Sequence, residues 1–356
     1  MSPARRTAFE ILLLVERGGF AADLLHARTA GLSPADAALA YEITLGCLRR
    51  QPQLDWRIEK LSGRPAARLD PEVRIALRIG LYQLHHLDRV PPHAAVSESV
   101  ELVKRSRKRS AAGLVNAVLR KTPQPVTWPD RATELCLPAW MLERWERHYG
   151  REAAERMARA FLEPPQTSVR ITPAGARIQD LGAQSIVPLL DLRPGLRVLD
   201  LCAAPGNKTA QAMESGAWVV AADVHPRRLA GLKTLGCPLV VLDGTRTLPF
   251  RKPFDRILVD APCSGTGTLD RNPEIKWRLK PEDLPRLHKK QVRLLSHALK
   301  LLAPGGRLVY STCSLEPEEN EAVVEEVLGG PPAFWAKRLP GFDPGDGFFA
   351  AVIGST

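Results

Sequence analysis

The spacing of apolar residues in this 356-residue chain changes at Pro194-Gly195, and this change constrains the possible folds more than any other feature. Beyond it, short apolar runs alternate with helical or turn-forming segments. The runs cover residues 197–201, 218–222, 239–242, 255–259 and 307–310, and a last one covers 348–353. Strands that alternate with helices are typical of a doubly wound parallel sheet. We therefore predict an α/β domain in the C-terminal part of the chain.

The N-terminal part has a different pattern, because apolar residues recur there at helical spacing from residue 4 to about residue 121. Ser33-Pro34 and Asp70-Pro71 each place a capping residue before a proline, which is a common start of a helix. After a first amphipathic segment, the expected helices cover residues 37–49, 53–61, 73–87, 93–106 and 113–120. Short loops join them, so the pattern predicts an all-α bundle.

The region between these two parts begins with a linker, residues 121–130, that contains three prolines. A helical pair is expected at 138–149 and 152–162, followed by a short segment at 168–172 and a helix at 178–190. We predict three parts: a helical domain, residues 1–125; a helical linking region, residues 126–185; and the α/β domain, residues 186–356.

The net formal charge of +11 points to a polyanionic partner, most directly a nucleic acid. The excess lies mainly in residues 1–125, where Lys and Arg outnumber Asp and Glu by 20 to 12. Within them, the stretch K-R-S-R-K-R supplies the cations Lys104, Arg105, Arg107, Lys108 and Arg109. We predict that these side chains contact phosphates. The alternative is a helix C-terminus whose cations complement the helix dipole.

The six cysteines have neither a C-x-x-C spacing nor a paired arrangement, so we expect no structural metal site and no disulfide framework. Cys47, Cys136 and Cys237 are expected to be buried apolar side chains. No apolar run reaches the roughly 18 residues of a membrane span, and no signal peptide is evident. These features predict a soluble, cytoplasmic protein.

The stretch V-L-D-L-C-A-A-P-G-N-K-T, residues 198–209, is predicted to run from a strand through a loop of small residues into a helix. Small residues let a backbone approach a ligand closely, and the sequence is not the G-x-G-x-x-G of dinucleotide sites. Asp200, Asp223, Asp243 and Asp260 each end a predicted strand. Parallel strands end at one edge of a sheet, so four carboxylates there suit an adenosine-containing cation such as S-adenosylmethionine. Taken singly, each carboxylate has a helix or turn cap as its alternative.

Two further motifs place thiols at the same predicted edge: D-A-P-C-S-G-T-G-T contains Cys263, and S-T-C-S contains Cys313. A thiolate that adds to C6 of a pyrimidine makes C5 electron-rich, so C5 can accept a methyl group from a sulfonium. A base then removes the C5 proton, and the thiolate leaves. Two thiols and Asp260 cover these steps, but their spacing does not show which cysteine attacks.

Together with S-T-C-S-L-E-P-E-E-N, these motifs resemble the signature set of the Sun/RsmB-type RNA cytosine-5 methyltransferases. A-Y-E-I-T-L-G-C-L-R-R and G-L-V-N-A-V-L-R-K resemble the NusB-like RNA-binding domain that precedes the catalytic domain in the 16S rRNA enzymes. The resemblance covers nearly the whole chain. It implies a NusB-like helical bundle, then a Rossmann-type domain that uses S-adenosylmethionine to form 5-methylcytosine in small-subunit rRNA.

The resemblance also implies roles for particular residues. Cys313 would be the nucleophile, Cys263 would assist product release, and Asp260 would contact the target cytosine near N3 and N4. The implied cofactor-binding residues are Cys202, Ala203, Ala204, Pro205, Gly206, Asn207, Lys208, Asp223, Asp243 and Asp260. The stretch R-N-P-E-I-K-W, residues 271–277, would line the RNA channel, and a buried Trp277 is the alternative.

Two positions depart from the family pattern. Asn207 replaces the second glycine of the usual A-P-G-G-K loop, and because Asn tolerates a left-handed backbone we expect cofactor binding to persist. Residues 166–185 are shorter than the RNA-binding subdomain that family members carry there, which bears on substrate positioning. The catalytic motifs do not show which RNA is the substrate, so a tRNA cytosine-5 methyltransferase is an alternative. A non-catalytic RNA-binding or antitermination factor is a second alternative. We expect a monomer.

Overall fold

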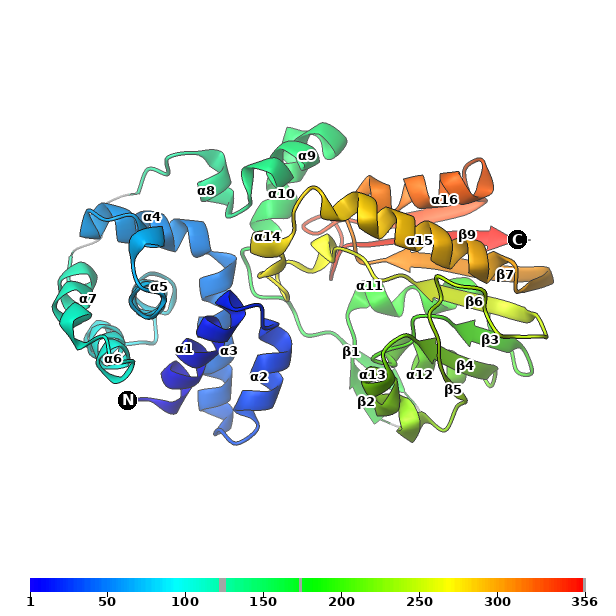
Figure 1. Cartoon of the computed structure of the whole chain (residues 1–356), viewed down its shortest axis with the longest axis horizontal. Coiled ribbons are helices and arrows are strands. Elements are labelled where there is room, and N and C mark those ends of the chain that lie inside the picture. The colour runs from blue at the N-terminus through cyan, green and yellow to red at the C-terminus, as the bar shows by residue number, and fades with distance from the viewer. Residues whose placement is uncertain (122–125, 173–174, 355–356) are drawn as a thin grey trace. The chain divides into compact units, whose positions relative to one another are not determined.

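A computed structural model describes residues 1–121, 126–172 and 175–354 of the chain. The chain forms two compact units, shown in Figure 1. The helical unit comprises Met1–Pro164 and Leu269–Arg278, and the sheet unit comprises Pro165–Thr268 and Leu279–Thr356. The helices that follow the linker thus belong to the helical unit. The three-part division proposed above, with limits at residues 125 and 185, stays a prediction.

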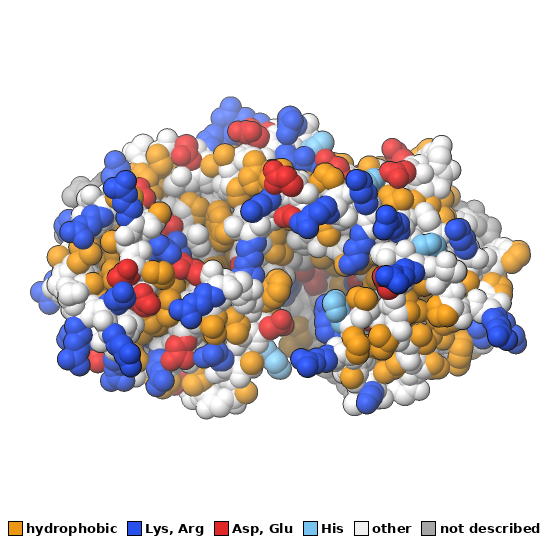
Figure 2. Space-filling view, viewed as in Figure 1, with side chains coloured by type: hydrophobic (Ala, Val, Ile, Leu, Met, Phe, Trp, Pro, Cys, Tyr) orange, Lys and Arg blue, Asp and Glu red, His pale blue; other side chains and the backbone are white. Residues whose placement is uncertain are grey.

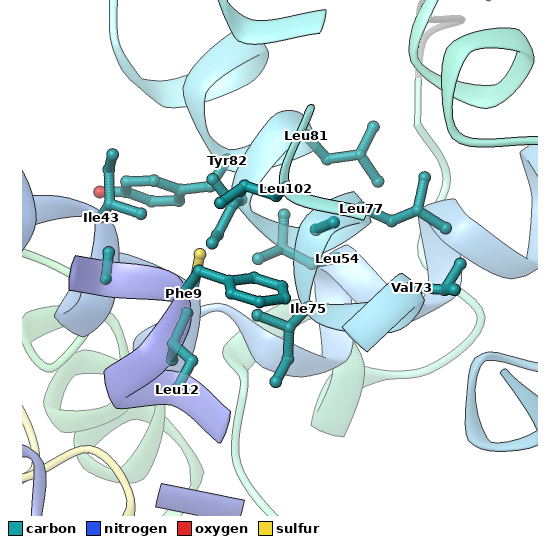
Figure 3. Close-up of a cluster of buried hydrophobic side chains, with 14 of the residues drawn as sticks. Phe9, Leu12, Ile43, Leu54, Val73, Ile75, Leu77, Leu81, Tyr82 and Leu102 are labelled. Atoms are coloured by element: carbon teal, nitrogen blue, oxygen red, sulfur yellow. The ribbon is translucent and has the colours of Figure 1, made fainter. Parts of the chain in front are cut away.

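The helical unit is built around one central helix, α5 (Pro71–His86), whose residues from Ile75 to Gln83 are all buried. It packs against α1 (Pro3–Glu16), α3 (Pro34–Arg49), α4 (Gln51–Ser62), α6 (Pro92–Arg105) and α7 (Ala112–Leu119), and α2 (Ala21–Thr29) packs against α1 and α3. Figure 3 shows Phe9 of α1, Ile43 of α3 and Leu54 of α4 in one buried cluster with side chains of α5 such as Ile75 and Tyr82. Burial of this apolar area is the main stabilisation of the bundle.

Local signals in the sequence explain where these helices begin. The Ser33 hydroxyl accepts a hydrogen bond from the Asp36 backbone N–H at 3.2 Å, as expected for the cap of α3. The linker is followed by α8 (Arg131–Leu135), α9 (Ala139–Tyr149) and α10 (Arg151–Ala160), and α14 (Ile275–Arg278) completes the helical unit. The helices expected before residue 165 are therefore present, with small differences at their ends.

The single helix expected at 178–190 is wrong. The strands β1 (Val169–Thr172) and β2 (Gly175–Ile178) form an antiparallel pair, and α11 (Leu181–Gln184) and the 3-10 helix η3 (Val187–Leu190) follow. Asp180 begins α11 as a cap, because its Oδ1 accepts a hydrogen bond from the Gly182 N–H at 2.7 Å. A cap and the proline of η3 interrupt the apolar pattern that had suggested one continuous helix.

Within the described residues the sheet unit holds a seven-stranded sheet with the order β5-β4-β3-β6-β7-β9-β8. The strands are β3 (Arg197–Asp200), β4 (Trp218–Asp223), β5 (Leu239–Val241), β6 (Phe254–Asp260), β7 (Leu302–Thr312), β8 (Phe334–Arg338) and β9 (Phe348–Gly354). The first five in this order are parallel, as expected, whereas β9 is antiparallel to β7 and to β8. The sheet is therefore mixed rather than wholly parallel.

Alternate side chains of the strands pack against layers of helices on the two faces of the sheet. Leu199, Ile257 and Leu308 lie on the face covered by α15 (Asp283–Leu299) and α16 (Glu321–Leu328). Their neighbours Leu258 and Val309 pack on the other face against η3. In Figure 1, α15 lies along β6 and β7, while α12 (Asn207–Met213) and α13 (Pro226–Ala230) lie beside β4 and β5. Because both faces are covered, the carboxyl edge of the parallel strands is the exposed place for a ligand.

Candidate active site

A cavity of about 680 Å³ lies at this edge, within the sheet unit. It is lined by Cys202, Asp223, Asp243, Asp260, Cys263 and Cys313, which lie at the ends of five parallel strands or in the loops that follow them. The strand order reverses between β3 and β6, and ligands of open α/β sheets bind at such a reversal. Both predicted thiols and three of the four strand-end carboxylates therefore share one cavity.

The fourth carboxylate, Asp200, does not belong to the rim, contrary to the expectation. It is 1% exposed, and its Oδ2 accepts a hydrogen bond from the Thr209 hydroxyl at 2.7 Å. Burial raises the pKa of Asp200 to about 7. This side chain therefore supports the start of α12 from below and is not presented to a ligand.

The loop between β3 and α12 reaches its tightest point at Gly206, whose φ is +105°. A Cβ atom there would lie 2.7 Å from Cγ of Leu232, so the close packing and the backbone conformation both require glycine. Asn207 is the first residue of α12 and is not among the residues with positive φ. The argument that Asn207 must tolerate a left-handed backbone was therefore wrong, because Gly206 takes that conformation.

Two of the rim carboxylates also bind the protein backbone. Asp223 Oδ2 accepts a hydrogen bond from the Ala204 N–H at 3.1 Å, and its Oδ1 accepts one from the His225 N–H at 2.8 Å. Asp243 Oδ1 accepts hydrogen bonds from Thr245, 3.0 Å from its N–H and 2.7 Å from its hydroxyl. The hydrogen bonds from Thr245 lower the pKa of Asp243. The capping role left open for single carboxylates thus applies to both, although both also face the cavity.

Asp260 is held by two partners beside the thiols. Lys208 Nζ donates to Asp260 Oδ2 at 2.6 Å, and the Ser311 hydroxyl donates to Oδ1 at 2.8 Å. Burial by itself lowers the pKa of Lys208, but the attraction and hydrogen bond of Asp260 outweigh it and raise that pKa. Lys208 is therefore a cation, and it forms an ion pair with Asp260, which lines the cavity.

The two thiols are in contact, with 3.3 Å between the Sγ atoms of Cys263 and Cys313. Neither forms a disulfide. The hydrogen bond with Cys313, followed by burial, raises the pKa of Cys263 well above its ordinary value. Cys263 is therefore held as a neutral thiol that can donate its S–H, and a thiolate is the nucleophilic form of cysteine.

A buried carboxylate that the sequence analysis missed joins the two cysteine loops. Glu319 is fully buried, and it accepts hydrogen bonds from the Ser264 N–H at 2.8 Å, the Ser314 hydroxyl at 2.5 Å and Gln291 Nε2 at 2.9 Å. The Ser264 hydroxyl also donates to it. Because Ser264 follows Cys263 and Ser314 follows Cys313, one side chain joins the two loops that carry the thiols. The repeated C-S pair and the acidic E-P-E-E-N tail were the available signals.

The segment expected to line an RNA channel packs inside the helical unit. Lys276 is 1% exposed and donates to the Arg49 carbonyl at 2.8 Å, and Trp277 Nε1 donates to the Leu48 carbonyl at 2.9 Å. Glu274 Oε1 accepts from the Ala21 N–H at 2.8 Å. Burial lowers the pKa of Lys276 to about 7. These contacts favour the alternative of an inward Trp277, and a role in an RNA channel stays a prediction.

The basic stretch around α6 is only partly compensated. Arg105 pairs with Glu101 at 2.9 Å and Lys108 with Asp70 at 2.9 Å. Lys104, Arg107 and Arg109 form no ion pair in the described part of the chain, and Arg107 has a φ of +63° because the helix ends at Arg105. Figure 2 shows Lys and Arg side chains spread over the visible face of each unit. Phosphate contact by the stretch stays a prediction.

Among residues 1–121, 126–172 and 175–354, no cluster of His, Cys, Asp and Glu side chains could hold a metal ion. No helix in those ranges has both the length and the apolar character needed to cross a bilayer.

Known proteins resemble both parts of the chain. The family model of the 16S rRNA methyltransferases RsmB/F matches residues 187–345, and the NusB family model matches residues 2–124. The ribosomal RNA small subunit methyltransferase B of Escherichia coli is 33% identical over 410 aligned residues, which cover 96% of this chain and 95% of that protein. The aligned length exceeds 356 residues, so the relative contains residues that this chain lacks.

Solved structures share the fold. PH0851 superposes with a TM-score of 0.81 at 21% identity and covers 100% of this chain and 99% of its own. A methyltransferase homologue from Pyrococcus horikoshii superposes with a TM-score of 0.53 at 27% identity and covers 65% of this chain and 100% of its own. The predicted order, an all-α NusB-like bundle and then a Rossmann-type α/β domain, is confirmed.

Proposed function

Because the chain belongs to the RsmB/F family of 16S rRNA methyltransferases, we propose that it methylates C5 of a cytidine in 16S rRNA through a cysteine adduct. Family membership establishes an rRNA methyltransferase that uses S-adenosylmethionine. The observation that supports cytosine C5 as the target is the pair of thiols, 3.3 Å apart, beside Asp260 in one cavity. Such a pair suits a reaction in which one thiol attacks the ring and another acts when that bond breaks.

The proposed reaction has three steps. The Cys313 thiolate forms a bond to C6, and the ring electrons move to C5. When bound, S-adenosylmethionine supplies the methyl group that C5 takes up. A base then removes the C5 proton, the electron pair of that bond restores the ring, and the bond between sulfur and C6 breaks. The neutral Cys263 thiol is suited to the last step, since its S–H can stabilise the departing Cys313 thiolate.

Asp260 and Lys208 are proposed to orient the base. A carboxylate can accept a hydrogen bond from the cytosine N4 amine, and Lys208 and Ser311 fix its orientation. We assign cofactor binding to the loop from Cys202 to Lys208 with the rim carboxylates Asp223 and Asp243. The target nucleotide has to leave its base stack to reach this cavity, which favours an accessible or single-stranded part of the RNA.

The match of residues 2–124 to the NusB family supports a role of the helical unit in binding the RNA. Within it we propose Lys104, Arg105, Arg107, Lys108 and Arg109 as phosphate contacts. The prediction that the protein is a monomer and needs no metal ion rests on the sequence alone. The tRNA alternative predicts methylation of naked tRNA in preference to 16S rRNA, so parallel assays on both RNAs decide between them.

The test of the mechanism compares the wild type with Cys313→Ala and Cys263→Ala in transfer of labelled methyl to 16S rRNA. Cys313→Ala should be inactive and form no adduct, because it lacks the attacking sulfur. Cys263→Ala should accumulate a protein–RNA band on denaturing gels, because release of the adduct is slowed. An adduct that instead requires Cys263 would reverse the two roles. A wild type that methylates neither rRNA nor tRNA would favour the non-catalytic RNA-binding protein.

A further inference from the structure

One face of α15 carries four cations, Arg286, Lys289, Lys290 and Arg293. Their spacing of three, one and three residues brings all four to one side of a helix. The opposite side holds the buried residues Leu284, Gln291, Leu294, Leu295 and Ala298 and packs on the sheet. The four cations, called the α15 basic row below, therefore point away from the core because of the amphipathic pattern of the helix.

The α15 basic row lines the cavity that contains both thiols and the carboxylate rim. Arg286 pairs with Asp283, one turn earlier in the same helix. Lys289, Lys290 and Arg293 are exposed and form no ion pair in the described part of the chain. The charge of Lys290 reaches the rim, since it adds to the effect of the Thr245 hydrogen bonds on the pKa of Asp243. Three cations without an ion pair thus stand at the wall of a cavity that also holds three carboxylates, and Arg228 of α13 lines the same cavity.

The two kinds of charge suit two different ligands. S-adenosylmethionine has two cationic groups, a sulfonium and an ammonium, and one carboxylate. The carboxylates of the rim therefore suit it, and its binding does not require three unpaired cations. A polynucleotide carries a phosphate on each side of every nucleotide. A cytidine that enters the cavity brings both flanking phosphates to its wall, where unpaired Lys and Arg side chains attract them.

We propose that the α15 basic row binds the RNA phosphates that flank the target cytidine. This inference rests on the proposed function, because it takes an RNA nucleotide as the occupant of the cavity. Phosphate contacts do not read the sequence, so the row positions the strand and leaves the choice of base to the cavity itself.

The test measures how binding of a 16S rRNA transcript depends on salt, without cofactor and hence without chemistry. In the triple variant Lys289→Gln, Lys290→Gln, Arg293→Gln, the slope of log affinity against log salt should fall by about 2, since each lost contact to a single strand removes about 0.7. Affinity near 0.1 M salt should fall at least tenfold. Affinity for S-adenosylmethionine, measured by calorimetry, should be unchanged.

The matched control, Arg251→Gln, Lys252→Gln, Lys300→Gln, removes the same charge from exposed positions of the sheet unit that do not line the cavity. It should keep most of the wild-type slope. The charge-retaining variant Lys289→Arg, Lys290→Arg, Arg293→Lys should also keep it, which separates loss of charge from damage to the fold.

Equal losses in the triple variant and the control would overturn the proposal, because they would show a general effect of net charge. A triple variant that binds RNA normally but loses cofactor affinity would assign the row to the cofactor carboxylate instead. Failure of the wild type to methylate cytosine C5 would contradict the proposed function alone, since the salt slope is measured without turnover.

Discussion

Glu319 is a residue whose importance comes from its position between two loops that lie 50 residues apart in sequence. Its carboxylate binds the residue after each cysteine, and no side chain of the reaction is bound to it directly. It is therefore a positioning residue for the contact of 3.3 Å between the two thiols. A buried acceptor with several donors is costly to remove, because each donor left unpaired costs about 1–3 kcal/mol.

We expect Glu319→Gln to lower kcat for methyl transfer at least tenfold and to leave the KM for S-adenosylmethionine nearly unchanged. The amide keeps the shape of the side chain but replaces one acceptor oxygen with a donor, so the Ser264 and Ser314 contacts cannot all be kept. Glu319→Ala should add a loss of stability. Both are measured by single-turnover methylation and by thermal unfolding.

Exposed Glu325 in α16 offers the matched control, and Glu325→Gln should match the wild type. A normal kcat in Glu319→Gln would show that Glu319 stabilises the fold without setting the thiol spacing. The rate of adduct formation in a Cys263→Ala background gives a second readout that a purely structural role would not change.

At the scale of elements, the turn from β3 into α12 depends on glycine at a single position. Gly206 combines a φ of +105° with contact to the Leu232 side chain. Asn207 begins the helix that follows, and its position does not require glycine. The departure from the family pattern at residue 207 therefore falls at a helical position, where asparagine is tolerated.

Gly206→Ala should weaken S-adenosylmethionine binding at least tenfold in calorimetry, because the loop must move to relieve a strain of about 1–3 kcal/mol. Asn207→Gly should change that affinity by less than threefold. Gly231→Ala is the control, since no atom lies within 4 Å of the added Cβ and its φ is not positive. Equal effects at positions 206 and 231 would refute the assignment of strain to this loop.

At the scale of the whole molecule, the chain leaves the sheet unit after Thr268 and returns at Leu279. The ten residues between belong to the helical unit and are fixed there by backbone contacts of Glu274, Lys276 and Trp277. This excursion starts at Leu269, six residues after Cys263. The loop that bears one thiol is thus continuous with a segment anchored in the other unit.

Lys276 gives this anchoring a measurable pH dependence. Its pKa falls from an ordinary value of 10.5 to about 7 in the folded chain, because burial disfavours the charge. Between these values the unfolded chain binds the additional proton, so the free energy of unfolding rises with pH from about 7 to about 10. Each pH unit in that window contributes up to about 1.4 kcal/mol.

We therefore expect the stability of Lys276→Met relative to the wild type to fall steadily as pH rises from 7 to 10. Thermal unfolding of the full chain at several pH values measures this difference. The control Lys280→Met changes an exposed side chain and should show a constant difference. A constant difference for Lys276→Met as well would mean that Lys276 is solvated in the folded chain.

The sequence by itself determined the two-part architecture and the edge of the sheet where the chemistry lies. Hydrophobic periodicity is local, so the helices of the bundle and the five parallel strands could be read from neighbouring residues. Parallel strands share one carboxyl edge. Asp223 and Asp260 end their strands, and Asp243, Cys263 and Cys313 follow theirs within three residues, so the sequence was enough to predict that these side chains lie together. The motifs then indicated the family.

Only the tertiary structure decided which side chains face the cavity and which support it. Asp200 and Asp260 both end strands, yet one is buried below the rim and the other lines the site, because neighbouring layers cover one and not the other. The contacts of Glu319, the insertion of residues 269–278 into the helical unit and the antiparallel pairing of β9 with β7 join segments distant in sequence. Such contacts leave no local period, since their energy depends on three-dimensional packing rather than on neighbouring residues.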